Sequence, residues 1–184
     1  MRLPGRTVFL LFVLALAGVL LATAGQLPPV VASHFDGAGR PNGWSSRSGY
    51  VVLILSIGIL LPLGIVGLVR GVSRGGPGRL NIPAREYWTS PEHRDEAVRR
   101  VRAYMWWLGV VLAGTALLMH AVVLAAHTSE PPRLRTEMFL LVFGAALSGI
   151  AGWTVGWYRL LRNPEETKRP AGAVAPPGRK SKQY

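Results

Sequence analysis

The chain contains no cysteine, and it carries little charge for its length. Without cysteine it has no disulfide, no thiolate ligand for a metal and no cysteine nucleophile. Charged residues make up 16% of the 184 residues, whereas a soluble domain carries roughly a quarter. Hydrophobic residues, at 49%, are gathered in blocks rather than spread in amphipathic periods. This composition argues against an ordinary soluble domain.

Four long blocks of the sequence hold almost no charge. They are residues 7–25, 50–69, 105–126 and 138–158. A helix rises ~1.5 Å per residue and needs about 20 residues to cross a ~30 Å hydrocarbon core, and none of the blocks has the polar face of a soluble helix. The sequence therefore predicts an all-α membrane protein with four transmembrane helices within residues 1–162. Residues 163–184 are rich in Pro, Gly, Ala and Lys, which predicts a disordered cytoplasmic tail.

Basic residues are distributed unevenly between the segments that join these blocks. Of the 21 Lys and Arg residues, seventeen lie before the first block, in the 70–104 loop or after the fourth block. Cytoplasmic loops of membrane proteins carry an excess of Lys and Arg. We therefore expect a multi-pass protein of the plasma membrane with both termini in the cytoplasm. The lipid bilayer is its expected partner, whereas no motif supports a nucleic acid as partner despite the net charge of +12.

The loop between the first two blocks contains the segment SHFDGAGRPNGW, Ser33 to Trp44. An extended run from Val30 to Phe35 is followed by two groups of turn residues, which predicts a short outer loop with a hairpin-like turn. Exposed loops of fixed shape often carry function. We predict that this loop is either a recognition element for an outer ligand or a packing element that covers the bundle. Its candidate residues are His34, Phe35, Asp36, Gly39, Pro41, Gly43 and Trp44.

The 70–104 loop contains the segment NIPAREYW, residues 81–88, followed by Thr-Ser-Pro-Glu. The second group is typical of a helix start, with a hydroxyl cap, an early proline and acidic residues in the first turn. No helix breaker follows, so this helix is expected to continue into the third block. We predict either a solvated juxtamembrane helix or a surface for a cytoplasmic regulator. The candidate surface residues are Asn81, Pro83, Arg85, Glu86, Tyr87, Trp88, Pro91 and Glu92.

Two ionisable residues, His120 and Glu137, stand inside or at the edge of the apolar blocks, where polar groups often have a function. His120 and His127 are seven residues apart and so share one helix face. Proton sensing, metal binding and simple hydrogen bonding that holds the outer loop on the bundle are all open. The spacing fits no compact metal motif, and no nucleophile triad or phosphate loop is evident. The sequence thus assigns no catalytic residue, no metal and no cofactor.

The second and fourth blocks each have a packing signal. Pro62 lies within the second block and is expected to kink its helix, because it removes a backbone hydrogen bond. The fourth block has small residues at every fourth position, a spacing that lets another backbone approach closely. This stripe serves either packing within the bundle or a homo-oligomer. It consists of Gly144, Ser148, Gly152 and Gly156.

The two loop segments resemble those of a known family. LPPVVASHFDGAGRPNGW resembles the extracellular loop of the bacterial membrane domain of unknown function found at the start of SdpI-type immunity proteins. NIPAREYW–SPEHR is similar to a cytoplasmic loop of stand-alone relatives of that domain. The resemblance implies a multi-pass bacterial membrane protein, and for SdpI itself it implies protection against a secreted peptide toxin and relay to a cytoplasmic repressor. The chain departs from SdpI in having four predicted spans instead of six.

Three functions remain open from the sequence. The first is a sensor or immunity-like binding protein with an outer recognition loop and a cytoplasmic partner surface. The second is a small transporter or metal-dependent membrane enzyme that uses polar residues at the outer side. The third is a structural subunit of a membrane complex that assembles through the small-residue stripe. The residues of the second hypothesis are His34, Asp36, His120 and Glu137.

Overall fold

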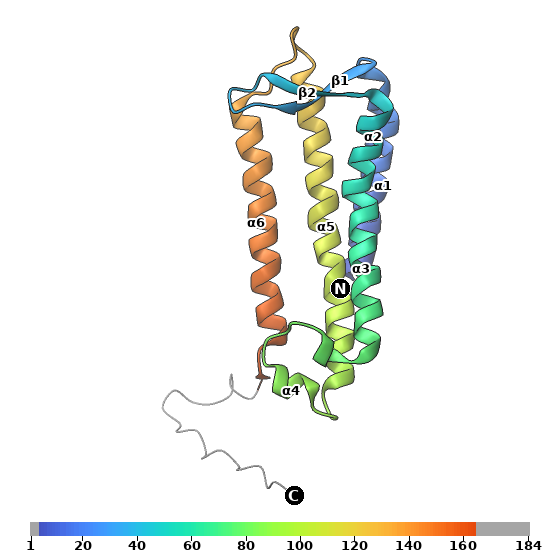
Figure 1. Cartoon of the computed structure of the whole chain (residues 1–184), viewed down its shortest axis with the longest axis vertical. Coiled ribbons are helices and arrows are strands. Elements are labelled where there is room, and N and C mark those ends of the chain that lie inside the picture. The colour runs from blue at the N-terminus through green and yellow to red at the C-terminus, as the bar shows by residue number, and fades with distance from the viewer. Residues whose placement is uncertain (1–3, 165–184) are drawn as a thin grey trace, which may run out of the picture.

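The computed structural model describes residues 4–164, which form a bundle of four long helices with a β-hairpin across one end (Figure 1). The first helix is α1, Gly5–Thr23. The second is composite and consists of α2 (Arg47–Leu55), a π-helical turn (Ser56–Leu60) and α3 (Leu61–Val72). The third and fourth are α5, Arg94–Ala126, and α6, Thr136–Leu161. All four are long and apolar enough to cross a membrane, so the prediction of four such helices is confirmed. Residues 165–184, which include most of the predicted tail, lie outside the described part.

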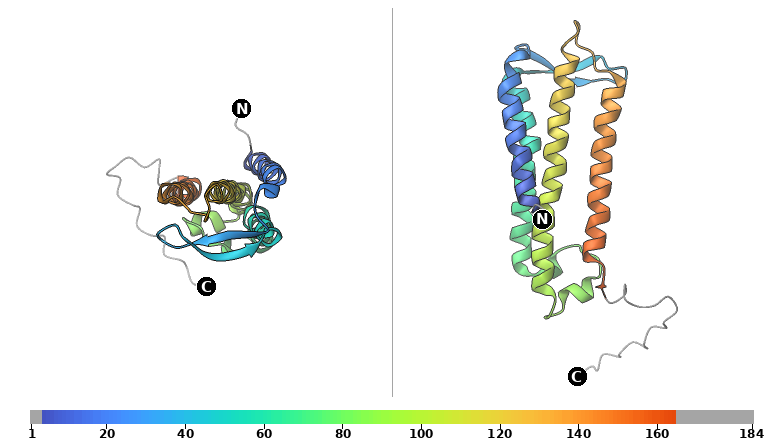
Figure 2. Two further views of the ribbon diagram at one scale, coloured as in Figure 1. Left: turned by 90° about the horizontal axis from the view of Figure 1, so that it is seen from above. Right: turned by 180° about the vertical axis from the view of Figure 1, so that it is seen from behind.

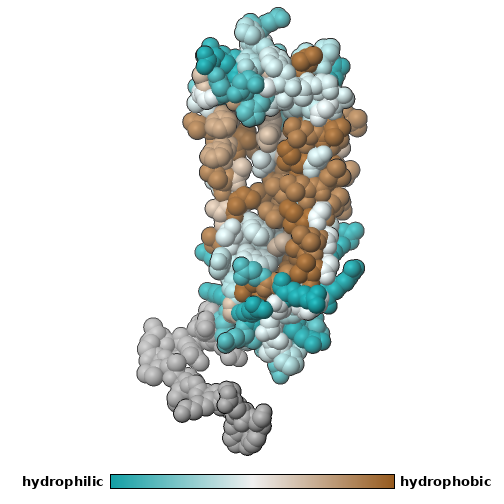
Figure 3. Space-filling model, viewed as in Figure 1, coloured by the Kyte–Doolittle hydropathy of each residue, from teal (hydrophilic) through white to brown (hydrophobic). Residues whose placement is uncertain are grey.

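Helix α5 is the centre of the bundle and contacts α1, the composite helix and α6 (Figure 2). Helix α6 packs chiefly against α5, and Leu161 is its one buried residue. The exposed side chains along the middle of the molecule are mostly apolar, whereas hydrophilic residues gather at its two ends (Figure 3). This surface fits a protein whose middle section is surrounded by hydrocarbon rather than water.

The π-helical turn lies immediately before Pro62, whose ring nitrogen cannot donate a hydrogen bond to the preceding turn. Gly58 in this turn lies so close to Leu16 of α1 and Ala116 of α5 that a β-carbon at this position would collide with Leu16. A π-helical turn widens the helix locally, so the helix can continue on both sides of a proline. The proline and the glycine together therefore let three helices approach one another closely.

The hairpin consists of β1, Val30–Phe35, and β2, Pro41–Ser46, paired antiparallel. The predicted extended run coincides with β1. The pairing is irregular beyond Ala32, which pairs with Trp44, because Ser33 is skipped and His34 pairs with Gly43. The hairpin runs from the top of α2 across the bundle towards the start of α6 (Figures 1 and 2). We refer to this side of the molecule as the hairpin end.

The opposite side, the arginine-rich end, is formed by residues 73–93 together with the adjoining ends of α3, α5 and α6. Two short 3₁₀ turns, Ser73–Gly75 and Pro77–Arg79, are followed by the five-residue helix α4, Arg85–Thr89. A small core forms here around buried Trp88, separate from the larger core beneath the hairpin. Each end of the bundle thus has its own closing element.

Candidate functional site

Asp36 determines the shape of the hairpin turn. One of its carboxylate oxygens accepts hydrogen bonds from the backbone N–H groups of Ala38 (2.9 Å) and Arg40 (2.8 Å), and the other accepts from the Arg40 guanidinium (2.9 Å). The backbone N–H of Arg40 is the main cause that holds the pKa of Asp36 below its ordinary value. The carboxylate is therefore fully engaged in the turn.

Gly39 and Gly43 are required by close contacts rather than by flexibility alone. Gly39 has a φ of 74° and lies against the backbone of Leu134, whose N–H donates to the Gly39 carbonyl at 2.9 Å. A β-carbon on Gly43 would lie 2.8 Å from Cβ of His34, the residue that it pairs with. These glycines let the segment 127–135 close over the hairpin and let the two strands meet at the irregular pair.

His34 is exposed, and its Nδ1 donates to Oδ1 of Asn42 across the hairpin at 2.7 Å. Trp44 is 54% exposed, although it pairs in register with the buried Ala32. Pro41 opens β2 opposite Phe35, which is half-buried. Of the predicted recognition residues, the histidine and the two aromatic residues therefore keep surface that a ligand can contact, whereas Asp36, Gly39 and Gly43 build the loop.

Beneath the hairpin lies an apolar pocket of about 330 Å³ between β1, α5 and α6. This volume falls within the range of small-ligand sites, roughly 300–1,000 Å³. The strand contributes Ser33, His34 and Phe35 to the lining. The remaining lining residues come from α5, α6 and the segment that joins them: Thr115, Met119, Val122, Val123, Leu134, Phe139, Val142, Phe143 and Ala146.

A second cavity of about 320 Å³ adjoins the first under the hairpin turn and shares Phe35, Leu134 and Phe139 with it. Its other lining residues belong to the turn and to the first turn of α6. The two cavities thus adjoin each other along the first part of α6, and most of their lining residues are apolar. We call this combined space the hairpin pocket.

His120 does not line the hairpin pocket. It is completely buried between three helices, with its Nε2 2.8 Å from Oγ1 of Thr23 and its Nδ1 3.1 Å from the Tyr50 hydroxyl. Because the Thr23 hydroxyl donates to the Val19 carbonyl at 2.6 Å, it must accept from Nε2–H, and Nδ1 must accept from Tyr50. Both imidazole nitrogens of a neutral His120 are thus satisfied.

His127 ties β1 to the end of α5. Its Nδ1 donates to the Val123 carbonyl at 2.8 Å, and its Nε2 accepts from the backbone N–H of Ala32 at 3.1 Å. Glu137 lies in the first turn of α6, is exposed and sits 3.7 Å from the Arg135 guanidinium. No group of three or more His, Asp or Glu residues within residues 4–164 is placed to hold a metal ion.

At the arginine-rich end, Trp88 is buried, and its indole N–H donates to the Leu161 carbonyl at the end of α6 (2.6 Å). Arg100 stacks on the Trp88 ring at 5.1 Å and donates to the Leu160 carbonyl. The segment NIPAREYW therefore closes the end of α6, and Tyr87 is half-buried in a stack with His93. The exposed residues of the predicted partner surface are Asn81, Arg85, Glu86, Pro91 and Glu92, with Pro83 half-buried.

The small-residue stripe of α6 does not lie on one contact face. Gly156 contacts Tyr104 of α5, and Gly149, outside the stripe, lies against Val111 of α5. Gly144 and Gly152 have no neighbour within 4 Å of an added β-carbon. The structure thus brings the lower end of the stripe against α5 and leaves its upper part on the outer surface.

Sequence reasoning did not identify the lining of the hairpin pocket or the partners of His120. The lining residues on α5 and α6 are ordinary apolar residues of membrane helices, and nothing in their pattern separates a pocket from a lipid-facing surface. Thr23 and Tyr50 are distant from His120 in the chain, so no spacing links them. The polar residues of the loop were identifiable because turn chemistry is local.

A family model described as a domain of unknown function (DUF1648) matches residues 10–60. The matched segment runs from α1 through the hairpin to the π-helical turn. No curated protein and no solved structure matches the chain. The first part of the chain is therefore similar to a family whose activity is not known.

Proposed function

We propose that the chain is a receptor-like binding protein of the plasma membrane that accepts an apolar segment of an extracellular peptide in the hairpin pocket. The observation that carries this proposal is the preformed apolar pocket of about 330 Å³ under a hairpin of fixed shape. Aromatic side chains on both sides, Phe35 above and Phe139 and Phe143 on α6, provide apolar surface for such a segment. His34 at the rim supplies a polar group for orientation.

The proposed orientation places the hairpin outside the cell. Residues 26–49 and the segment 127–135 carry four Arg residues, whereas the arginine-rich end and the sequence flanking it carry the rest of the Lys and Arg residues. This asymmetry favours a cytoplasmic arginine-rich end. The resemblance of the loop to that of SdpI-type immunity proteins supports a bacterial origin and a peptide as ligand.

A ligand in the hairpin pocket has a direct mechanical route to the other end. The pocket lies between α5 and α6. At its far end α6 is held by the hydrogen bond from the Trp88 indole N–H to the Leu161 carbonyl. If a ligand binds more tightly to a conformation with one distance between α5 and α6 than to a conformation with another distance, it increases the population of the first conformation. The exposed residues beside Trp88 would then present a changed surface to a cytoplasmic regulator. Those residues are Asn81, Arg85, Glu86 and Glu92.

Photocrosslinking in cells tests the proposal. A benzoylphenylalanine replaces Phe143, which lines the pocket, and in a matched control it replaces Leu141, which is exposed on α6 outside the pocket. We expect a peptide adduct at position 143 that is absent at position 141. The additional substitution Ala146→Trp, which fills the pocket, should abolish that adduct. Lipid adducts alone, or equal peptide adducts at both positions, would refute the proposal.

A second candidate function is that of a subunit in a membrane complex. It is favoured by the exposed face of α6, where Gly144 leaves space next to exposed Leu140 and Leu147. Small residues of this kind permit close helix contacts. If this face binds another helix, Gly144→Leu should remove a crosslinked oligomer, whereas Gly18→Leu on α1, which also has open space, should not.

A further inference from the structure

A second site lies at the arginine-rich end, in a pocket of about 680 Å³ between the 3₁₀ turns and the first turns of α5. Arginines dominate its lining: Arg74, Arg94, Arg99 and Arg102. The one carboxylate in the lining, Asp95, is 3.6 Å from Arg94, so it balances the charge of Arg94 and not that of the other three arginines. The pocket therefore keeps an excess of positive charge that no group in its own lining neutralises.

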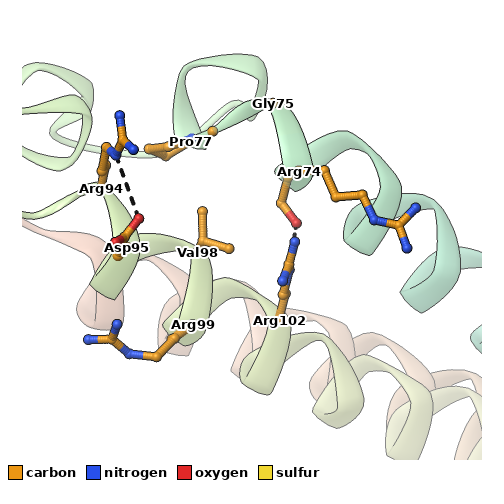
Figure 4. A pocket seen from close by; sticks show the side chains of 10 residues that line it. Arg74, Gly75, Pro77, Arg94, Asp95, Val98, Arg99 and Arg102 are labelled. Carbon is orange, nitrogen blue, oxygen red and sulfur yellow. Dashed lines mark hydrogen bonds and ion pairs between the residues drawn. The ribbon is translucent and has the colours of Figure 1, made fainter. Parts of the chain in front are cut away.

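Arg102 is held in position across this pocket. Its Nε donates to Oγ of Ser73 at 2.7 Å, and its Nη2 donates to the Arg70 carbonyl at 3.3 Å. Both acceptors are uncharged, so its guanidinium is oriented but its charge remains unpaired. Figure 4 shows this contact, the Arg94–Asp95 pair at the other end of the pocket, and Arg74 and Arg99 extending from the rim. The two rim arginines are exposed and have no ion-pair partner within residues 4–164.

The position of the pocket along the bundle axis indicates its level relative to a membrane surface. Phe9 of α1 packs on Trp106 of α5 at 5.5 Å between ring centres, and the Arg70 guanidinium lies over the Trp106 ring at 5.3 Å from its centre. Arg102 precedes Trp106 by four residues and lies on the same helix face, about 6 Å nearer to the arginine-rich end along the helix axis. Tryptophan gathers at the boundary between hydrocarbon and headgroups. The arginines of the pocket therefore lie at headgroup level.

The helix that covers this face of α5 ends just above the pocket. Helix α1 begins at Gly5, beside Trp107, whereas α5 extends 13 residues further, to Arg94. The face of α5 that α1 covers at Trp106 and Gly109 thus continues towards Arg102 without α1 over it, as the course of the two helices shows (Figures 1 and 2). Within residues 4–164, this side of the pocket is therefore not covered by α1.

We propose that this pocket binds the phosphate headgroup of an anionic phospholipid. Guanidinium groups match phosphate oxygens with paired, charge-assisted hydrogen bonds. Lipid is favoured over a soluble phosphate compound because the pocket lies at headgroup level and is open beside the end of α1. The site is independent of the hairpin pocket, which lies at the opposite end of the molecule.

Lipid retention by the purified full-length chain tests this site. The chain in mild detergent is offered equal amounts of phosphatidylglycerol and phosphatidylcholine, and bound lipid is counted by native mass spectrometry. The wild type should retain phosphatidylglycerol several-fold over phosphatidylcholine. The double variant Arg74→Gln/Arg99→Gln should reduce phosphatidylglycerol retention by about 25-fold, since each basic residue near anionic lipid contributes a factor of roughly five. Both arginines are exposed, so the variant is expected to fold, as checked by gel filtration.

The matched control is Arg133→Gln/Arg135→Gln, which removes the same charge at the hairpin end and should retain phosphatidylglycerol as the wild type does. Equal loss in the control would refute the site, because a general charge effect would then explain retention. Equal retention of the two lipids by the wild type would also refute it. Displacement of the lipid by excess inorganic phosphate would assign the pocket to a soluble phosphate compound and overturn the lipid proposal.

Discussion

Polar residues inside the bundle act as fixed hydrogen-bonding groups. His120 of α5 bridges Thr23 of α1 and Tyr50 of α2, so that one buried side chain joins three helices. In hydrocarbon surroundings an unpaired polar group costs several kcal/mol, because no water is present to form a hydrogen bond with it. The residue that sequence analysis marked as a functional candidate thus has a complete structural role.

Replacing His120 by Leu should destabilise the bundle without affecting its fold. The substitution leaves the Tyr50 hydroxyl without its acceptor in a buried position, which should lower the free energy of unfolding by about 1–3 kcal/mol. Thermal unfolding in detergent, followed by gel filtration, measures the effect. Thr115→Val is the control, because the Thr115 hydroxyl bonds only its own helix at Val111. Equal melting temperatures for the two variants would contradict the proposed bridge.

At Gly39 the backbone conformation and the contact with Leu134 both exclude a side chain. Gly39→Ala should therefore loosen the contact between the hairpin and the segment 127–135, at a cost of about 1–3 kcal/mol for the left-handed backbone alone. Hydrogen exchange of the Leu134 amide, which donates to the Gly39 carbonyl, reports that contact. Gly37→Ala has open space and should leave exchange unchanged. Similar exchange in both variants would show that the contact does not depend on Gly39.

At the scale of elements, α6 is held mainly at its ends. Along its length it packs against α5, and Leu161 is its one buried residue. At the hairpin end the segment 127–135 and the hairpin contact each other, and at the arginine-rich end Trp88 caps the last turn. Helix α6 is thus joined to the rest of the described chain by its contact with α5 and by these connections at its two ends.

Trp88→Phe tests the cap of α6. The change keeps an aromatic ring but removes the N–H that donates to the Leu161 carbonyl, which should cost about 1–3 kcal/mol and speed hydrogen exchange in the last turn of α6. Trp153→Phe is the matched control, since the Trp153 indole N–H has no acceptor within residues 4–164. Faster exchange in the Trp153→Phe control, or an unchanged exchange rate in Trp88→Phe, would contradict the proposed cap.

At the scale of the molecule, the two ends differ in charge and in structure. The hairpin end is closed by a hairpin with turn residues, and the arginine-rich end by a short helix around a tryptophan. The uneven distribution of arginine predicts that the two ends lie on opposite sides of a membrane in one orientation. The absence of cysteine makes this orientation directly measurable, because no native thiol interferes.

Single cysteines at Ala38 and at Glu92 test the orientation. Ala38 lies in the exposed hairpin turn and Glu92 in the exposed part of the arginine-rich end. In intact cells a membrane-impermeant maleimide should label Ala38→Cys and not Glu92→Cys. Permeabilised cells should show labelling of both. The reverse pattern in intact cells would place the hairpin in the cytoplasm and contradict both the orientation and the proposed extracellular ligand.

Several features follow from local sequence alone. The four long apolar blocks determine four helices, since a run of about 20 uncharged residues has few other stable arrangements. The extended run Val30–Phe35 and the turn chemistry around Asp36 likewise predict β1 and its turn. From the sequence, the long helix α5 is expected to begin with Pro91 in its first turn under a hydroxyl cap. It begins at Arg94 instead, and its N-cap residue His93 makes no side-chain capping hydrogen bond.

What the chain can bind depends on packing that local sequence does not encode. Trp88 belongs to a loop segment, yet it is buried because α6 ends beside it. The hairpin pocket lies where β1 meets α5 and α6, and most of its lining residues are of the same apolar kinds that face lipid elsewhere. Sequence determines which residues avoid water. Only the tertiary structure decides which of them face lipid, which face another helix and which surround a space, because that choice depends on contacts between residues far apart in the chain.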